Sequence, residues 1–174
     1  MRGLVRAAEV FDRAIEFLLL RLALPAATAA LAVALLSMAA QVVSRYFFGW
    51  SLVWSEEVAR YALAWSTMLG AAVAYHKVDN IAVTVLLERF PALARYALTP
   101  AIHAASLVFA LVLLVEGWAF TARNFARGQM TTALEIPIAW IYLAMPVGGA
   151  LIAVAAVAGL LRGRPTFQPP RLED

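Results

Sequence analysis

Residues 22–43 read LALPAATAALAVALLSMAAQVV, a run without a charged side chain that is interrupted only by Thr28, Ser37 and Gln41. The hydrocarbon core of a bilayer is about 30 Å thick, and about 20 apolar residues of helix cross it. A helix also satisfies its own backbone hydrogen bonds, which a lipid environment requires. The run therefore predicts a membrane-spanning helix.

Three further runs have a similar length and character, and none shows the period-two alternation that β-barrel strands require. They are residues 58–75, 101–120 and 138–161. The sequence thus predicts an all-α integral membrane protein with four transmembrane helices, forming a single membrane domain over residues 1–174.

The composition of the whole chain agrees with a membrane protein. Apolar residues make up 64% of its 174 residues and charged residues 14%, against about 25% charged residues in soluble domains. The mean hydropathy is +0.81. The absence of cysteine excludes disulfides, thiol chemistry and iron–sulfur clusters. No glycine-rich phosphate loop is present, which argues against an ATP motor.

The basic residues predict an orientation, because Lys and Arg are enriched in cytoplasmic loops. Ten of the 14 Lys and Arg residues fall in the segments before the first run, between the second and third runs, and after the fourth run. The other four are Arg45, Arg60, Arg123 and Arg127. Both termini are therefore expected in the cytoplasm. The net charge of +3 is explained by this pattern, and no nucleic-acid partner is predicted.

The segments outside the runs are expected to lie at the membrane surface and to contact membrane lipids. Residues 1–21 and 77–95 show amphipathic helical periodicity. The first of these either lies on the surface or extends the first span. Pro91 and Pro100 predict a break in the chain or a helix start before the third run. Residues 162–174 form a tail that is too short to be a domain.

The sequence WSEEVARY at residues 54–61 is the densest polar feature beside an apolar run. Ser55 fits a helix N-cap, and acidic residues favour the first turn of a helix. Glu56 and Glu57 can both pair with Arg60, at spacings of four and three residues. Two interpretations are equally open: a well-capped helix start, or a charged docking point for a partner. Trp54 is expected to anchor the helix at the membrane interface.

Small residues recur at every fourth position of three runs and predict close packing of helices in lipid, either within this chain or against another membrane protein. They are Ala26, Ala30 and Ala34 in the first run, Ala62, Ser66, Gly70 and Ala74 in the second, and Gly149 with Ala153 in the fourth.

Three ionisable residues leave alternatives open. Glu116, about one turn from the outer end of the third run, is expected to snorkel to the membrane surface or to pair with Arg60 or Arg123, or else to contact a partner or handle an ion. His76 and His103 fit packing roles, or the axial ligands of a haem-bearing membrane anchor. A third class of function is a small transporter or channel that works alone. No catalytic residue, metal site or cofactor is predicted.

Several motifs resemble a known family, that of the DctQ-type small transmembrane subunits of tripartite ATP-independent periplasmic (TRAP) transporters. The central motifs are Arg45–Phe48, Trp54–Tyr61, Trp65 and Leu69–Ala71, and the motifs similar to the family's last span are Ile136–Pro137, Tyr142 and Met145–Gly148. One departure is visible: Asn80 and Thr84 stand where the family often has histidine and an acidic residue.

The resemblance implies a scaffold in the bacterial inner membrane that binds a large DctM-type membrane subunit. In this family the large subunit carries the substrate and sodium sites, and a periplasmic substrate-binding protein delivers an organic acid. An ion gradient supplies the energy, so the small subunit is not expected to be an enzyme. The residues expected at the partner interface or in structural roles are Trp54, Glu56, Glu57, Arg60, Tyr61, Gly70, Asn80, Glu116 and Pro146.

Overall fold

The computed structural model describes residues 13–78 and 92–162, and within them the chain is helical apart from its turns and loops. The elements are η1 (Leu18–Ala23), α2 (Leu24–Val43), η2 (Ser44–Phe48), α3 (Val53–Val78), α5 (Ala92–Arg127), α6 (Ala139–Tyr142) and α7 (Ala144–Arg162), where η denotes a π-helical turn. The described residues contain no strand, only one isolated bridge between Met130 and Pro137. The predicted all-α class is confirmed.

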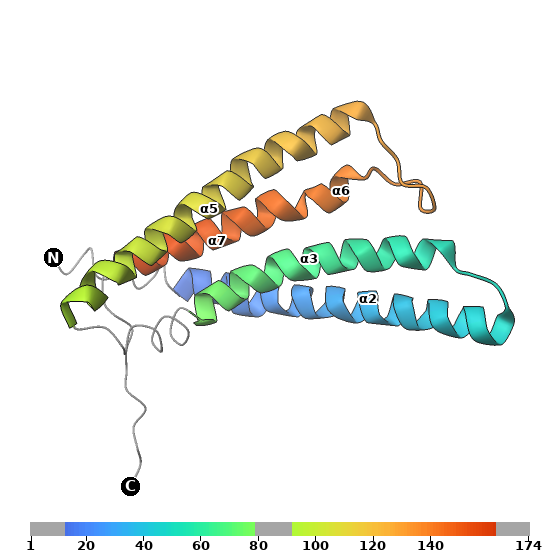
Figure 1. Ribbon diagram of the computed structural model, residues 1–174, viewed down its shortest axis with the longest axis horizontal. Coiled ribbons are helices and arrows are strands. Elements are labelled where there is room, and N and C mark those ends of the chain that lie inside the picture. Colours follow the sequence, from blue (N-terminus) through green and yellow to red (C-terminus); the bar gives the residue numbers. More distant parts are fainter. Residues whose placement is uncertain (1–12, 79–91, 163–174) are drawn as a thin grey trace, which may run out of the picture.

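The long helices form two antiparallel hairpins, α2 with α3 and α5 with α7 (Figure 1). The hairpins meet where α3 packs against α7, so α2 and α5 lie on the outside. The turn after α2 and the loop before α6 lie at one end of the molecule, which we call the loop end. The structure is therefore an open layer of helices in the order α2, α3, α7, α5, and it leaves large apolar surfaces uncovered.

Three helical stretches are long and apolar enough to cross a membrane: Arg13–Phe48, Pro100–Arg127 and Ala139–Leu160. The fourth long helix, α3, is less apolar because it carries Glu56, Glu57 and Arg60 near its start and Lys77 near its end. Three spanning helices thus match the expectation by length and composition, and a fourth span through α3 stays a prediction.

Helix α7 approaches its neighbours at glycines, where the missing side chain lets backbones come close. A Cβ atom on Gly149 would lie 2.8 Å from the backbone nitrogen of Leu114 and 2.9 Å from the carbonyl oxygen of Ala110, both on α5. A Cβ atom on Gly148 would lie 2.9 Å from the Cβ of Met68 on α3. The packing predicted for the face of Gly149 and Ala153 is confirmed, since both residues are buried.

The other two small-residue faces pack only in part within this chain. On α3, no atom lies within 4 Å of the place of a Cβ on Gly70, and Ala74 is exposed. On α2, Ala34 is buried but Ala26 is exposed, and the other buried positions are Ala27 and Ser37. On α2 the predicted face was wrong because an outer helix of an open layer has one neighbour, and that neighbour contacts a different face.

The prolines act differently from the expectation. Pro100 lies inside α5, which runs without interruption from Ala92 to Arg127. The fourth run, expected to be one helix, is instead divided between α6 and α7 at Leu143. Pro146 explains the division: it has no N–H to donate to the carbonyl of Tyr142, four residues earlier, and its ring crowds that carbonyl. Pro91 lies outside the described residues.

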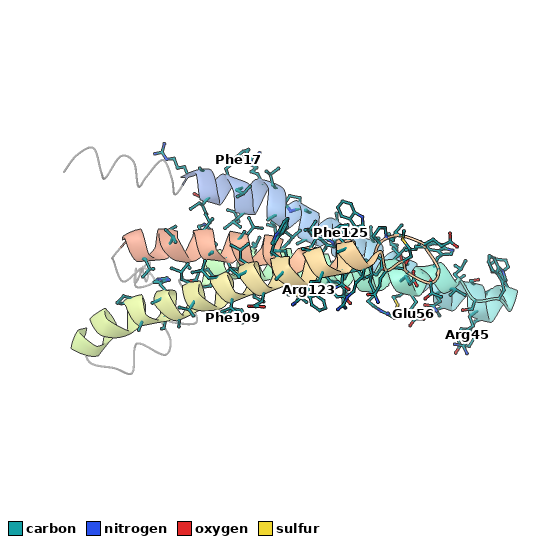
Figure 2. The ribbon with its side chains drawn as sticks, turned by 90° about the horizontal axis from the view of Figure 1, so that it is seen from above. Phe17, Arg45, Glu56, Phe109, Arg123 and Phe125 are labelled. Atoms are coloured by element: carbon teal, nitrogen blue, oxygen red, sulfur yellow. The ribbon has the colours of Figure 1, made fainter. Side chains whose placement is uncertain are left out.

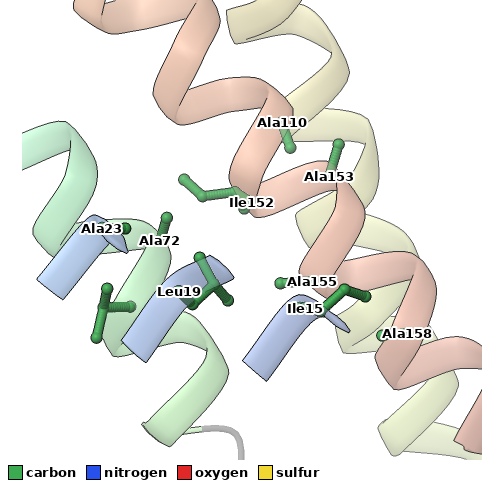
Figure 3. Close-up of a cluster of buried hydrophobic side chains, with 10 residues drawn as sticks. Ile15, Leu19, Ala23, Ala72, Ala110, Ile152, Ala153, Ala155 and Ala158 are labelled. Atoms are coloured by element: carbon green, nitrogen blue, oxygen red, sulfur yellow. The ribbon is translucent and has the colours of Figure 1, made fainter. Parts of the chain in front are cut away.

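A buried hydrophobic cluster lies away from the loop end and joins the start of the first helical stretch to α3, α5 and α7. Its labelled members in Figure 3 are Ile15, Leu19, Ala23, Ala72, Ala110, Ile152, Ala153, Ala155 and Ala158. Leu19 is fully buried, whereas the neighbouring Phe17 and Leu18 are exposed. Residues 13–23 thus continue into α2 as one helical stretch, which fits the reading that this segment extends the first span. Residues 1–12 lie outside the described part.

Replacing Gly149 by alanine tests the close approach of α5 and α7. The added methyl group would meet backbone atoms that cannot rotate away, and such overpacking costs about 1–3 kcal/mol. The matched control is Gly70→Ala, which adds the same methyl group in open space. We expect thermal unfolding in detergent to occur at a lower temperature for G149A and at an unchanged or higher temperature for G70A. Equal midpoints for both variants would contradict the packing.

Candidate functional site

The loop between α5 and α6 is a compact hydrogen-bonded turn at the loop end. The backbone N–H of Thr131 donates to the carbonyl of Ile136 at 2.9 Å, and that of Ile138 donates to Gln129 at 3.0 Å. Glu135 closes the turn with a φ of 52°, a left-handed conformation that is uncommon for a residue with a side chain. These bonds leave the N–H groups of residues 132–134 free to bind an acceptor.

Glu57, in the first turns of α3, is that acceptor. Its Oε1 accepts hydrogen bonds from the backbone N–H groups of Thr132 and Ala133, both at 3.0 Å. Its Oε2 accepts a third hydrogen bond from the N–H of Leu134 at 3.1 Å. One carboxylate on the first hairpin thus holds the connecting loop of the second hairpin, more than 70 residues away in the sequence.

Two effects act on the pKa of Glu57. Partial burial raises the pKa, because it disfavours the charged form. The hydrogen bonds from the N–H groups of Ala133, Leu134 and Thr132 and from the Thr131 side chain lower it, and together they outweigh burial. The pKa of Glu57 therefore lies below its ordinary value of 4.5. The carboxylate is charged at neutral pH, where its hydrogen bonds are strongest.

The other charged residues of the motif at 54–61, and its serine, make local contacts. Arg60 pairs with Glu56 at 3.5 Å, as the spacing of four residues predicted, and both side chains are about two-thirds exposed, at 67% and 62%. Exposed pairs of this kind contribute little to stability. Ser55 was expected to be the N-cap, but α3 already begins at Val53. The buried Ser55 hydroxyl instead donates to the carbonyl of Leu52 at 2.6 Å.

A second bond joins the hairpins near the division between α6 and α7. The indole N–H of Trp65 on α3 donates to the carbonyl of Trp140 on α6 at 3.1 Å. The aromatic rings of Phe120 and Tyr142 pack edge to face, with centroids 4.6 Å apart. Trp65 was named only through a family motif, and its hydrogen bond gives that motif a structural role.

Exposed aromatic side chains surround the loop end. In the turn after α2, the most exposed are Phe47 (82%) and Tyr46 (80%). Trp54 is 44% exposed at the start of α3, and Tyr61 is half-buried further along that helix. Aromatic rings at such positions suit the headgroup region of a membrane.

The histidine His103 lies towards the opposite end and serves packing. Its Nδ1 lies 2.9 Å from the hydroxyl of Tyr75, and its ring is 7% exposed. The ring also fills the space beside Gly159, where an added Cβ would lie 2.6 Å from it. This contact joins α3, α5 and α7 at one point. No group of three potential metal ligands occurs in residues 13–78 and 92–162.

The remaining predicted residues are scattered over the structure. Glu116 is exposed on α5, and across the described part of the chain no ion pair joins it to Arg60 or Arg123. Pro146 is buried and packs beside Gly117 of α5. Asn80 lies outside the described residues.

The loop residues 132–134 were missed by the sequence analysis. They contribute backbone N–H groups rather than side chains, so their residue types carry no signal for binding a carboxylate. The only signal was indirect: two acidic residues faced one arginine, which left one acid to find another partner.

Replacing Glu57 by alanine should release the loop. Without the carboxylate, the N–H groups of residues 132–134 lose their acceptor and exchange with solvent more readily. The matched control is Glu56→Ala, which removes an exposed carboxylate that does not touch the loop. Hydrogen exchange in detergent should be faster at residues 132–134 in E57A than in E56A. The same protection in both variants would contradict the role of Glu57.

The lowered pKa of Glu57 also predicts an acid-sensitive loop. Because the folded pKa is below the ordinary value of 4.5, ionised Glu57 stabilises the folded protein above pH 4.5. That stabilisation is lost as the pH falls through the lowered value. The midpoint of thermal unfolding should therefore decrease more steeply below pH 4.5 in the native protein than in E57Q, which is neutral throughout. If the unfolding midpoints of the native protein and of E57Q decreased in parallel with pH, the ionised Glu57 carboxylate would not be the stabilising form.

A family model comparison matches residues 34–166, more than half of the chain. The family is described as the DctQ component of tripartite ATP-independent periplasmic transporters. The match includes part of α2, the whole of α3, α5 and α7, and the loop that Glu57 holds.

Individual relatives agree with this match. The chain is 29% identical over 109 residues to a sialic acid TRAP transporter small permease protein of Vibrio cholerae, covering 63% of this chain and 62% of the relative. It is 30% identical to a C4-dicarboxylate TRAP transporter small permease protein of the same species, covering 65% and 58%.

A third similarity is to part of a much longer protein. The chain is 30% identical over 108 residues to a sialic acid TRAP transporter permease protein of Haemophilus influenzae, covering 62% of this chain and 17% of the relative. The chain thus spans a little under two thirds of the V. cholerae sialic acid relative and about a sixth of the longer permease. With a family model that covers most of its length, the chain belongs to the DctQ component family of the TRAP transporters, whose members are small permease subunits.

Proposed function

We propose that this chain is the membrane scaffold subunit of a TRAP-type secondary transporter, which supports a large permease subunit during solute uptake. One observation carries the proposal: the chain aligns with only 17% of a longer TRAP permease protein. The aligned region is a small part of that longer permease, which supports a division of labour between this region and a large membrane part that moves the solute.

The proposed subunit spans the bacterial inner membrane four times, with both termini in the cytoplasm. Helix α3 has 26 residues, or about 39 Å at 1.5 Å per residue, which is enough to cross. Three charged residues cluster at its start and Lys77 lies near its end, so residues 61–76 contain no Lys, Arg, Asp or Glu. The loop end then faces the periplasm, where few basic residues occur.

The carboxylate of Glu57 gives the periplasmic end a fixed shape. Its hydrogen bonds are all made within the molecule, to the loop between α5 and α6. The Glu56–Arg60 pair beside it remains exposed and can be contacted by a partner. The two interpretations of the motif therefore apply to different residues: Glu57 is structural, and Glu56 and Arg60 are proposed as the docking point.

The proposed cargo is an organic acid delivered by a periplasmic substrate-binding protein. The named cargoes of the two small-permease relatives, sialic acid and C4-dicarboxylate, are both organic acids. The energy would come from an ion gradient coupled through the large subunit. In this arrangement the scaffold performs no reaction of its own.

Reconstitution in proteoliposomes tests the proposal. Vesicles that contain this chain and its large subunit, with the binding protein outside and a sodium gradient imposed, should accumulate the organic acid. Omitting this chain should reduce uptake to background, and this chain alone should be silent because it lacks the moving subunit. Full uptake without this chain would contradict the scaffold role. Uptake or conductance by this chain alone would show a self-sufficient transporter instead.

A further inference from the structure

Helix α5 carries a charged side chain on a surface that lipid would otherwise cover. Glu116 is exposed within the apolar stretch Pro100–Arg127, one of the three that can cross a membrane. Its neighbours Val112 and Val115 are 53% and 61% exposed. Glu116 lies seven residues before Arg123, which is about 10 Å along the helix axis. It lies four residues, about 6 Å, before the end of the expected span 101–120, and a carboxylate within a span is costly in lipid and usually faces protein or water.

The other outer helix differs in this respect. The outward face of α2 is built from large apolar side chains that are about half exposed or more: Leu31, Leu35, Leu36, Met38 and Val42. Residues 22–43 contain no charged side chain. Lipid tails can cover this face without cost, so α2 gives no reason to expect a protein partner.

Glu116 shares its side of the molecule with a groove. The groove has a volume of about 330 Å³ and opens between α3 and α5 above α7; it is lined by Ala71, Tyr75, Ala105, Ser106, Phe109 and Ile152. At 100° per residue, Phe109, Glu116 and Phe120 lie within about 40° of one another around α5. Figure 2 labels Phe109 on the α5 ribbon, away from Phe17 on the first helical stretch. We call the groove together with Phe109, Glu116 and Phe120 the groove face.

We propose that the groove face is the surface on which the large permease subunit docks, and that this subunit places a cationic or N–H donor group opposite Glu116. The inference rests on the proposed function and extends it by naming the face and the chemistry of the contact. The outer face of α2 is then left to lipid.

Charge complementarity selects the partner. A carboxylate within a spanning segment needs a hydrogen-bond donor or a cation, which the hydrocarbon tails of lipids do not offer. Within residues 13–78 and 92–162, the only ion pair is that of Glu56 with Arg60, so no described residue pairs with Glu116. A side chain of the large subunit can supply the donor and can fill the groove beside it with apolar groups.

Site-specific photocrosslinking tests the proposed face in the assembled complex. Phe109 and Trp118 are equally exposed, at 60% and 61%, and they lie nine residues apart, so they point in opposite directions from α5, about 180° apart. Each is replaced by p-benzoylphenylalanine in a separate variant co-expressed with the large subunit, and Leu35 on α2 is replaced as a third site. We expect a crosslink to the large subunit from position 109 and none from positions 118 and 35.

Other crosslinking outcomes would overturn the proposal. A crosslink to the large subunit from position 118 or 35, with none from 109, would place the docking surface elsewhere and leave the scaffold function intact. If position 109 crosslinked only to a second copy of this chain, that copy and not the large subunit would cover the groove face. If the native chain does not co-purify with the large subunit at all, the proposed function itself fails.

Charge reversal tests the role of Glu116 separately. The variant E116K should reduce the amount of co-purified large subunit by about tenfold or more, because two like charges, or a charge and an unpaired donor, would face each other. The matched control is V115K, which places the same lysine one residue away on an exposed position that lies off the groove face. Expression levels of both variants in the membrane normalise the comparison. Equal losses for E116K and V115K, or no loss for E116K, would overturn the assignment.

Discussion

The contact of α7 with both of its neighbours is the constraint on which this structure depends. Lipid tails are as apolar as the side chains that they surround, so burial of apolar surface does not drive spanning helices together. Close packing must do so, and α7 provides it at Gly149 against the backbone of α5 and at Gly148 against Met68 of α3. The Gly149 contact holds the second hairpin together, the Gly148 contact joins it to the first, and the result is an open layer of four long helices (Figure 1).

The loop end is fixed by electrostatics rather than by packing. Glu57 binds three backbone N–H groups of the loop between the outer helix α5 and the short helix α6. The Trp65 indole adds a bond to the carbonyl of Trp140 where Pro146 divides the fourth apolar run. Both interactions begin on α3 and end on the second hairpin, so α3 holds that hairpin at two levels. The proposed scaffold function requires such rigidity.

The sequence predicted the class of the protein well because the membrane imposes strong rules on composition. The apolar runs gave the all-α class and three spans of sufficient length, and the spacing of Gly149 and Ala153 indicated a packed face. The spacing of Glu56 and Arg60 gave their ion pair. The motifs of residues 54–61 and 145–148 led to the correct family.

The parts that could not be predicted depend on tertiary structure. The partner of Glu57 is a set of backbone N–H groups, which leave no trace in residue types. The packed face of α2 was misplaced because periodicity shows which residues are small but not which neighbour they meet. Pro100 was expected to break a helix and lies within one, whereas Pro146 was not expected to divide a helix and does. Proline disfavours helix locally, and the surrounding contacts decide whether the helix continues.

The central claim is that the two hairpins form one rigid unit while the large subunit moves. Pulsed electron paramagnetic resonance distances between spin labels at Leu36 on α2 and Val108 on α5, both exposed on outer helices, test it most directly in the reconstituted complex. The account predicts the same distance distribution with and without sodium and the loaded binding protein. A shift of that distribution between the two conditions would show that the hairpins move against each other and would contradict the account.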